Sequence, residues 1–295
     1  MQKLYILDGS WYMYRAYHAL PEITGKTGEN MNAVFGFFRM VFKLFQNRPD
    51  FFVVAWDGPT KTLRHQQYAE YKANRPEISD DFKNQIWIIK NIVKDLNMNC
   101  YEIPWYEADD IIYSIANNVK NENTQIFIES LDKDLKQLID KNIFFSDSSK
   151  AEITDRDRFV WEFGFEPKCI VDYLALVGDA SDNVPGVKWI GKKTAQDLIS
   201  KYCYIDEIYK NIDEVSASVR EKLLEQKETL FNSKSLIQLY QIDELQELKI
   251  DNLKLEIDFD LYREILKNKL GFKSAENIID NLRKLYQSGE QLSLF

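Results

Sequence analysis

Short apolar segments alternate with longer amphipathic segments through the first half of the chain, and this alternation constrains the fold more than any other feature. The apolar segments have the length and the β-branched or aromatic character of buried strands. They are Lys3–Leu7, Phe51–Trp56, Gln125–Glu129 and Asn142–Phe145. Strands separated by helices are typical of a mostly parallel sheet. The sequence therefore predicts an α/β fold with a mostly parallel central sheet flanked by helices.

Two of the intervening segments, Ala33–Phe45 and Asp81–Leu96, predict helices. In the second, apolar residues recur at steps of three and four, which places them on one helical face. Ser79 precedes it and is a suitable N-cap. From about Phe165 onward the chain has helical character without strand alternation. We therefore expect an α/β core over 1–165 and a helical region over 166–285.

Composition limits the class of protein. The chain has 295 residues, of which 45% are hydrophobic, so it can bury a full core. No apolar stretch approaches the roughly 18 residues needed to cross a bilayer, and the first residues do not form a signal peptide. The cysteines Cys100, Cys169 and Cys203 are far apart and form no CxxC pair, which argues against zinc and against a disulfide framework. We expect a cytoplasmic monomer with no membrane partner.

Acidic residues stand at the ends of successive predicted elements. They are Asp8, Asp57, Glu107, Asp109, Asp110, Asp132, Asp134, Asp179 and Asp182. Any one of them alone is more simply explained as a turn, an N-cap or a solvated loop residue. Side chains at the carboxyl ends of parallel strands converge on one crevice, however, and so many carboxylates cannot share a crevice without cations. Oxygen ligands without His or Cys select Mg²⁺ or Mn²⁺ rather than zinc.

Two such ions can hold a scissile phosphate between them, one activating a water and the other stabilising the leaving oxygen. The net charge of −9 at first argues against a phosphate-binding protein. With the nine acids above set aside, the remaining acidic side chains equal the 38 basic ones in number, so the composition remains compatible with basic DNA-facing patches.

Several motifs occur together and in order. They are LDGS, YRAYHALP, NAVFGF, WDGP, LRHQQYAEYKANRP, EADD, SLDKDLKQL, LVGDASDNVPGV and IGKKTAQDLI. From about Lys3 to Ser200 the chain thereby resembles the 5′-nuclease domain of bacterial DNA polymerase I and the stand-alone 5′–3′ exonucleases related to flap endonucleases. The resemblance implies a helical arch over the active site at about 60–97 and a helix–hairpin–helix at about 178–202.

The resemblance also implies roles for individual residues. Two Mg²⁺ ions are expected, with Mn²⁺ as a substitute. The implied first metal cluster is Asp8, Asp57, Glu107, Asp109 and Asp110, and the second is Asp132, Asp134, Asp179 and Asp182. In the arch, Lys72 and Arg75 are expected to contact the scissile phosphate, and Tyr71 to stack on the terminal base. Arg64 is expected to bind substrate, whereas Arg15 could contact phosphate or pair with a metal-binding acid.

The helix–hairpin–helix implies a phosphate site for the uncut duplex, made by backbone amides and by nearby lysines. Its expected residues are Gly186, Gly191, Lys192, Lys193 and Thr194, with K⁺ as a possible ion at the hairpin. The spacing is close to a Walker A loop, but Lys193 stands at the Ser/Thr position and no strand precedes it. Trp189 stands where the family has glycine, so we expect it either to loosen the hairpin or to contact DNA.

The last residues predict a protein partner. A polar segment at 287–290 precedes Gln291, Leu292, Leu294 and Phe295, and we expect 286–295 to be a flexible tail. These residues resemble the peptide by which bacterial repair enzymes bind the β sliding clamp, and they imply a natural C-terminus. The alternative is a tail that folds back over the protein's own core.

The sequence thus predicts a metal-dependent 5′-nuclease that cuts branched or nicked double-stranded DNA at 5′ flaps, nicks or 5′ ends. Two alternatives stay open. One is an RNA-directed nuclease with related metal chemistry, and the other is a DNA-binding module that has lost activity.

Overall fold

The computed structural model describes residues 1–26, 28–147 and 150–288, and its centre is a six-stranded sheet. The strands are β1 (Gln2–Asp8), β2 (Phe51–Trp56), β3 (Cys100–Glu102), β4 (Thr124–Glu129), β5 (Ile143–Asp147) and β6 (Glu152–Thr154). Their order across the sheet is β3-β2-β1-β4-β5-β6. All neighbouring pairs are parallel except β5 and β6, which are antiparallel. The predicted α/β fold with a mostly parallel sheet is confirmed.

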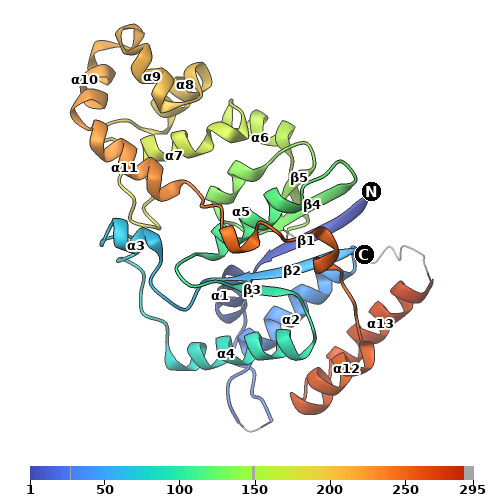
Figure 1. Ribbon diagram of the computed structural model, residues 1–295. Coiled ribbons are helices and arrows are strands. Elements are labelled where there is room, and N and C mark those ends of the chain that lie inside the picture. The colour runs from blue at the N-terminus through green and yellow to red at the C-terminus, as the bar shows by residue number, and fades with distance from the viewer. Residues whose placement is uncertain (27, 148–149, 289–295) are drawn as a thin grey trace.

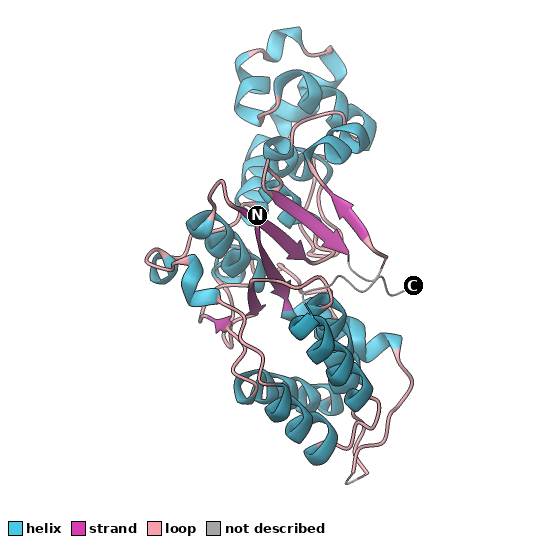
Figure 2. Cartoon of the chain, turned by 90° about the vertical axis from the view of Figure 1, so that its right-hand side faces the viewer, coloured by secondary structure: helices cyan, strands magenta, loops and turns pink. Residues whose placement is uncertain are grey.

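Helices cover both faces of this sheet. The first seven are α1 (Gly9–Ala19), α2 (Asn32–Phe45), α3 (Leu63–Gln67), α4 (Asp80–Asp95), α5 (Ala108–Val119), α6 (Arg156–Phe163) and α7 (Ile170–Val177). The others are α8 (Lys192–Tyr202), α9 (Ile205–Lys210), α10 (Ala217–Glu225), α11 (Lys227–Ile237), α12 (Phe259–Arg263) and α13 (Ala275–Ser288). Figure 1 shows α5 on one face of the sheet and α1, α2 and α4 on the other. Figure 2 shows a purely helical lobe, α8–α11, at one end of the sheet.

The side chains of the central strands alternate between two hydrophobic cores. In β1, Leu4 and Ile6 face the core that contains α5, whereas Tyr5 and Leu7 face the core that contains α2. Because both faces are buried, the strand is apolar at almost every position, as expected for a parallel sheet between helices. The two three-residue strands β3 and β6 were not predicted, because segments this short carry little periodicity.

The predicted helices agree with α2 and α4. Ser79 caps α4 as predicted, since its hydroxyl accepts a hydrogen bond from the N–H of Phe82 at 3.2 Å. The arch expected over 60–97 is helical only at its ends, in α3 and α4. Residues 68–79 between them form turns and extended chain, and α4 packs into the α2 core through Ile89 and Val93.

The helices within 166–285 divide between the two cores. Helices α7 to α11 belong to the core on the α5 face, but α12 and α13 pack on the opposite face, against α2. The apolar stripe of α13, which contains Ile279, Leu282 and Leu285, is buried there. The sequence predicted helical character in this part of the chain but could not indicate which core each helix joins.

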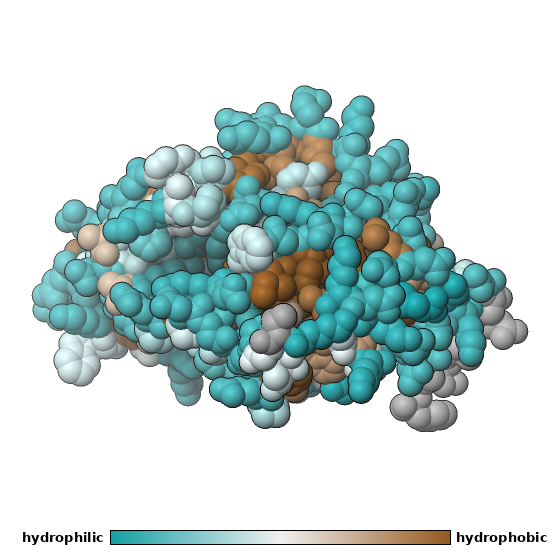
Figure 3. All heavy atoms as spheres, turned by 90° about the horizontal axis from the view of Figure 1, so that it is seen from below, coloured by the Kyte–Doolittle hydropathy of each residue, from teal (hydrophilic) through white to brown (hydrophobic). Residues whose placement is uncertain are grey.

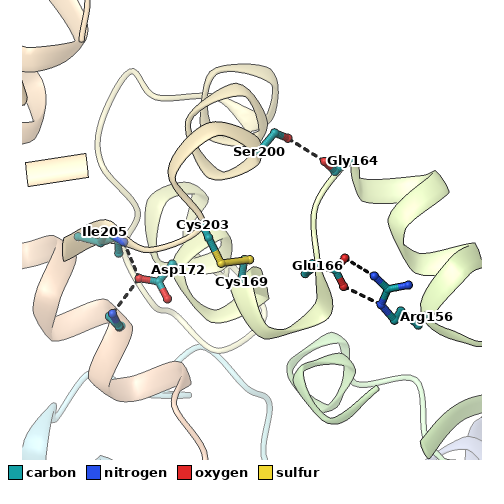
Figure 4. Close-up of a disulfide and its surroundings, with 9 residues drawn as sticks. Arg156, Gly164, Glu166, Cys169, Asp172, Ser200, Cys203 and Ile205 are labelled. Atoms are coloured by element: carbon teal, nitrogen blue, oxygen red, sulfur yellow. Dashed lines mark hydrogen bonds and ion pairs between the residues drawn. A yellow bond between two sulfur atoms is a disulfide. The ribbon is translucent and has the colours of Figure 1, made fainter. Parts of the chain in front are cut away.

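Cys169 and Cys203 form a disulfide, which corrects the expectation, drawn from their wide spacing, that the cysteines form no disulfide framework. Cys169 ends a short 3₁₀ helix (Pro167–Cys169) just before α7, and Cys203 directly follows α8. Figure 4 shows the bond joining these two helix ends beside the contact from the Ser200 hydroxyl to the Gly164 carbonyl. The sequence separation of 34 residues gave no local sign of this pairing, because it arises from the packing of α7 and α8.

One face of the surface shows where apolar side chains are exposed. The face seen from below in Figure 3 is largely hydrophilic, and apolar side chains gather there over a limited area. Among the described residues no helix has the length and apolar character needed to span a bilayer.

Candidate metal centre

The first carboxylates of the site lie at the carboxyl ends of adjacent parallel strands. Asp8 ends β1 and also caps α1, where its Oδ1 accepts the N–H of Trp11 at 2.9 Å. Its Oδ2 accepts a hydrogen bond from the Ser130 hydroxyl, just after β4, at 2.7 Å. Burial and the neighbouring charges of Asp57 and Asp132 raise the pKa of Asp8 to about 7, although the two hydrogen bonds act to lower it. A cation beside Asp8 would offset the free-energy cost of keeping this buried carboxylate ionised.

The EADD motif opens α5, as its spacing predicts. Glu107 is the N-cap, and Asp57 fixes the helix start because its Oδ1 accepts the Ala108 N–H at 2.9 Å. Burial raises the pKa of Asp109 well above its usual value, and the charges of Asp132 and Asp8 raise it further. Asp109 therefore belongs to the same electrostatic cluster as the strand-end acids.

A second group comes from the chain after β4 and after α7. Asp134, Asp179 and Asp182 are buried, and each offers a carboxylate oxygen within 4.8 Å of the others. Burial raises the pKa of Asp134 well above its usual value, and the three nearby aspartates raise it further. Within the described part of the chain, the buried Oδ1 of Asp134 has no hydrogen-bond partner. An orphaned carboxylate oxygen facing two further carboxylates has the chemistry of a divalent-cation ligand.

Lys133 offsets part of this negative charge. Its ammonium lies 2.9 Å from Oδ1 of Asp179. Burial acts to raise the pKa of Asp179, but hydrogen bonds from Ser181 and Lys133 outweigh it and hold the pKa below its usual value. Sequence reasoning missed this role of Lys133, although its place between the two acids of the DKD motif was a signal.

The two predicted metal clusters form one continuous site. The Tyr71 hydroxyl lies 3.0 Å from Oε2 of Glu107 and 3.2 Å from Oδ2 of Asp182, so it joins the two clusters. The Lys72 ammonium lies 2.8 Å from Glu107 and 3.7 Å from Asp182. Burial alone would lower the pKa of Lys72, but these two carboxylates outweigh it and raise the pKa. Asp132 acts on both groups, since its charge raises the pKa values of Asp8 and Asp109 in the first group and of Asp134 in the second.

Lys72 and Arg75 lie at this site, on the turn that follows α3. The Arg75 guanidinium lies 2.6 Å from Oδ1 of Asp182. Lys72 has φ of +54°, and its backbone N–H donates to the Asp182 carbonyl at 2.9 Å. A non-glycine residue in this region is strained, and such strain is typical of residues whose side chains are held at functional sites.

Asp110 and Arg64 differ from their predicted roles, because they pair with each other. Arg64 donates to both carboxylate oxygens of Asp110, at 2.7 and 2.8 Å. These oxygens also accept the backbone N–H groups of Tyr240 and Glu107. All acceptor sites of Asp110 are used, which leaves none for a metal ion. Arg64 is 2% exposed, so its side chain is not available to DNA.

Tyr71 and Arg15 have different neighbours in the structure from those predicted. The ring of Tyr71 is buried, so it cannot stack on a terminal base in this conformation. Arg15 lies 3.4 Å from Asp147 and stacks on Trp11, and its side chain is 29% exposed. Of the two alternatives open for Arg15, the ion pair is present, but with an acid outside the predicted metal set.

The predicted hairpin lies directly after Asp182. A Cβ at Gly186 would lie 2.4 Å from the Val177 backbone, so only glycine fits this close crossing. Gly191 is the N-cap of α8, and Lys192 and Lys193 begin the helix exposed to solvent, with Thr194 behind them. This places backbone N–H groups and ammonium groups at one helix start, as a phosphate site requires.

Trp189 does not loosen the hairpin. The N–H of Ile190 donates to the Val187 carbonyl at 3.1 Å and closes a four-residue turn, in which Trp189 takes φ of +69°. Trp105, before the EADD motif, likewise takes a left-handed φ of +74°. The partner-binding residues predicted in the tail, Gln291, Leu292, Leu294 and Phe295, lie outside the described residues.

Comparison with known proteins identifies the family. Residues 3–164 match the 5′-3′ exonuclease N-terminal resolvase-like domain, and residues 165–258 match the 5′-3′ exonuclease C-terminal SAM fold. The chain belongs to the 5′-3′ exonuclease family. It is therefore a nuclease, and the family resemblance carried by its motifs is confirmed. The family's chemistry depends on metal ions, and the buried acidic cluster of Asp134, Asp179 and Asp182 fits this dependence.

Relatives of this exonuclease differ in length. A 5′-3′ exonuclease of Aquifex aeolicus is 39% identical over the whole of both chains. A DNA polymerase I of Caldicellulosiruptor bescii is 42% identical over 79% of this chain but only 28% of its own length. Among solved structures, a bacteriophage T5 D15 flap endonuclease in complex with DNA and metal ions has a TM-score of 0.68. It covers 97% of this exonuclease and 100% of the phage chain at 16% identity, and this likeness shows a shared fold.

Proposed function

We propose that this exonuclease hydrolyses DNA phosphodiester bonds at 5′ flaps, nicks and recessed 5′ ends by two-metal-ion catalysis, as in primer removal and repair. The observation that carries the proposal is the buried carboxylate cluster, in which the Oδ1 of Asp134 has no hydrogen-bond partner among the described residues. The expected ion is Mg²⁺, with Mn²⁺ as a substitute, because the ligands are hard carboxylate oxygens.

The proposed ligands are eight of the nine predicted acids, with Asp110 serving as the anchor of Arg64. These eight are Asp8, Asp57, Glu107, Asp109, Asp132, Asp134, Asp179 and Asp182. When bound, the cations would supply Lewis-acid activation of a water and stabilise charge on the scissile phosphate. The chain's own cations act beside them. Lys72 and Arg75 now pair with Glu107 and Asp182. If these two acids held metal ions, Lys72 and Arg75 would be free to donate to the phosphate.

The helical lobe is proposed to hold the uncut duplex of branched or nicked DNA, with the protein acting as a monomer. Support comes from the N-terminus of α8, where Gly191, Lys192, Lys193 and Thr194 gather amide and ammonium donors, and from the DNA-bound phage endonuclease of the same fold. The Trp189 carbonyl points to the Lys222 ammonium, 3.4 Å away. K⁺ at this hairpin would have to share that carbonyl with Lys222.

A cleavage assay tests the activity. A DNA duplex with a labelled 5′ flap is expected to be cut in Mg²⁺ or Mn²⁺, to give a 5′-phosphate product, and to stay intact in EDTA. Asp134→Asn is the informative variant, and Asp157→Asn, an exposed acid on α6, is its matched control. Equal cleavage by both variants would contradict the metal site, and preferential cutting of folded RNA would favour the alternative substrate.

The tail carries a separate proposal, which is binding to the β sliding clamp. It rests on the order of Gln291, Leu292, Leu294 and Phe295, in which apolar side chains could fill a pocket while the amide makes directional hydrogen bonds. Deletion of 291–295 is expected to leave cleavage of short flaps unchanged and to remove stimulation by the clamp. Equal clamp affinity of the full-length and shortened proteins would reject it.

A further inference from the structure

Trp189 occupies a backbone position that disfavours it. It is the third residue of the turn from Val187 to Ile190, and its φ of +69° lies in the left-handed region. Turns of this shape favour glycine at the third position, because a Cβ there meets the neighbouring backbone. A tryptophan here costs free energy that a glycine would not.

The folded protein gains nothing visible from the indole in return. Trp189 is 85% exposed, whereas its neighbours Val187 and Ile190 are 3% and 5% exposed and anchor the turn in the core. Burial therefore cannot offset the backbone strain. Within the free protein, both the backbone and the side chain of Trp189 are unfavourable.

The turn is held by contacts on both sides, so the direction in which the Trp189 side chain leaves the backbone is set. The Lys188 N–H donates to Oε1 of Gln226, beside the end of α10, at 2.8 Å. The Trp189 carbonyl accepts a hydrogen bond from the Lys222 ammonium at 3.4 Å. These contacts anchor the turn on both sides of Trp189, whose side chain lies exposed to solvent.

The surroundings of Trp189 have the charge that a polyanion requires. Lys188 precedes it, and Lys192 and Lys193 follow it at the exposed start of α8. Trp161 provides a contrast, since it is 87% exposed on α6 but stands next to the acidic Glu162. An aromatic face among ammonium groups fits a partner that offers both phosphates and flat apolar surface, which is the chemistry of nucleic acid.

We infer that Trp189 is a duplex-contacting residue: it packs against the sugars and base edges of the uncut DNA while Lys188, Lys192 and Lys193 hold the adjacent phosphates. The inference rests on the proposed function, and it assigns to the hairpin an apolar contact in addition to the ionic ones. An aromatic contact buries apolar surface without releasing counterions, so it adds affinity that salt does not screen.

Trp189→Gly tests this with two readouts of opposite sign. Thermal unfolding is expected at a higher temperature, because glycine removes the strain. Affinity for a nicked duplex, measured in Ca²⁺ to prevent cleavage, is expected to fall about tenfold, the order of loss typical for an aromatic contact. The slope of log Kd against log salt should stay unchanged, whereas Lys193→Ala should reduce it by about one unit. Trp161→Ala is the matched control and should leave affinity unchanged.

Three results would overturn the inference. The first is an unchanged DNA affinity of Trp189→Gly. The second is a lower unfolding temperature of this variant together with an equal loss of DNA affinity in Trp189→Gly and Trp161→Ala. The third is a salt slope that falls together with the affinity of Trp189→Gly. Failure of the proposed function is distinguishable, because it would show as absence of Mg²⁺-dependent cleavage by the unsubstituted protein.

Discussion

The guanidinium of Arg64 donates two hydrogen bonds to the carboxylate of Asp110, at 2.7 and 2.8 Å, and neither residue is more than 2% exposed. Arg64 also donates to the carbonyls of Leu236, in the last turn of α11, and of Gln238, just after this helix. The pair therefore ties three parts of the chain together: α3, the start of α5, and the segment that returns from the helical lobe. Because Arg64 also lies 3.3 Å from Glu107, the pair stabilises the chain directly beside the proposed metal site.

Replacing Arg64 with Met should destabilise the protein rather than weaken DNA binding. The change leaves the Asp110 charge buried without its partner, which typically costs about 3–5 kcal/mol. Urea unfolding measures this loss. Asp110→Asn should cost stability for the same reason, and a double variant with both residues apolar should recover part of it. Wild-type stability of both single variants would show that the pair is not an anchor.

Lys72→Met should slow the chemical step by roughly a hundredfold or more, as the loss of one preorganised donor to a developing charge does. Methionine keeps the length of the stem and removes the ammonium that faces Glu107 and Asp182. Single-turnover cleavage at saturating enzyme isolates this step from binding. Lys61→Met is the control: this exposed lysine lies just before α3, away from the turn that carries Lys72, and the variant should cleave at the normal rate. Equal rates for both variants would remove Lys72 from the catalytic group.

The metal-free protein should lose stability as pH rises from about 4 to 7. The pKa of Asp8 is raised from 3.8 to about 7 by burial, and burial also raises the pKa values of Asp109, Asp132 and Asp134. The folded state then holds more protons than the unfolded state in this window, so the free energy of unfolding falls by about 1.4 kcal/mol per pH unit for each extra proton. Asp179, whose pKa is lowered, acts below this window.

Urea unfolding in EDTA at a series of pH values measures this slope. Saturating Mg²⁺ should flatten it, because bound cations favour the ionised carboxylates, and Asp8→Asn should flatten it in part. The exposed Asp157→Asn should leave it unchanged. Stability that rises between pH 4 and 7 in EDTA would contradict the coupling of these acids.

Much of the fold and of the site followed from local sequence signals. The strands and helices were predicted from periodicity, and the convergence of the acids was predicted from where parallel strands end. Both kinds of signal are local, so the predicted elements and the meeting of the acids agree with the structure. What the sequence could not provide was long-range pairing. Arg64 looked like a surface cation because its partner Asp110 is 46 residues away. Tyr71 looked like a stacking residue, but its burial depends on how the turn after α3 packs against Asp182.

The disulfide between Cys169 and Cys203 should stabilise the helical lobe in the oxidised protein. It closes a sequence separation of 34 residues between the start of α7 and the end of α8, and loops of this size gain about 2–4 kcal/mol from a cross-link. The reduced protein should remain folded, because other contacts join the same elements. The Ser200 hydroxyl donates to the Gly164 carbonyl, and Asp172 accepts hydrogen bonds from the Ile205 N–H and the Lys234 ammonium.

Thermal unfolding with and without a thiol reductant, such as dithiothreitol, tests this prediction. The reductant should lower the unfolding temperature of the wild type and leave that of Cys203→Ser unchanged. Cys100→Ser is the matched control, because Cys100 is a free cysteine on β3 and should leave the response to reductant intact. Equal unfolding temperatures of the oxidised and reduced wild type would mean that the link between α7 and α8 contributes nothing to the stability of the lobe.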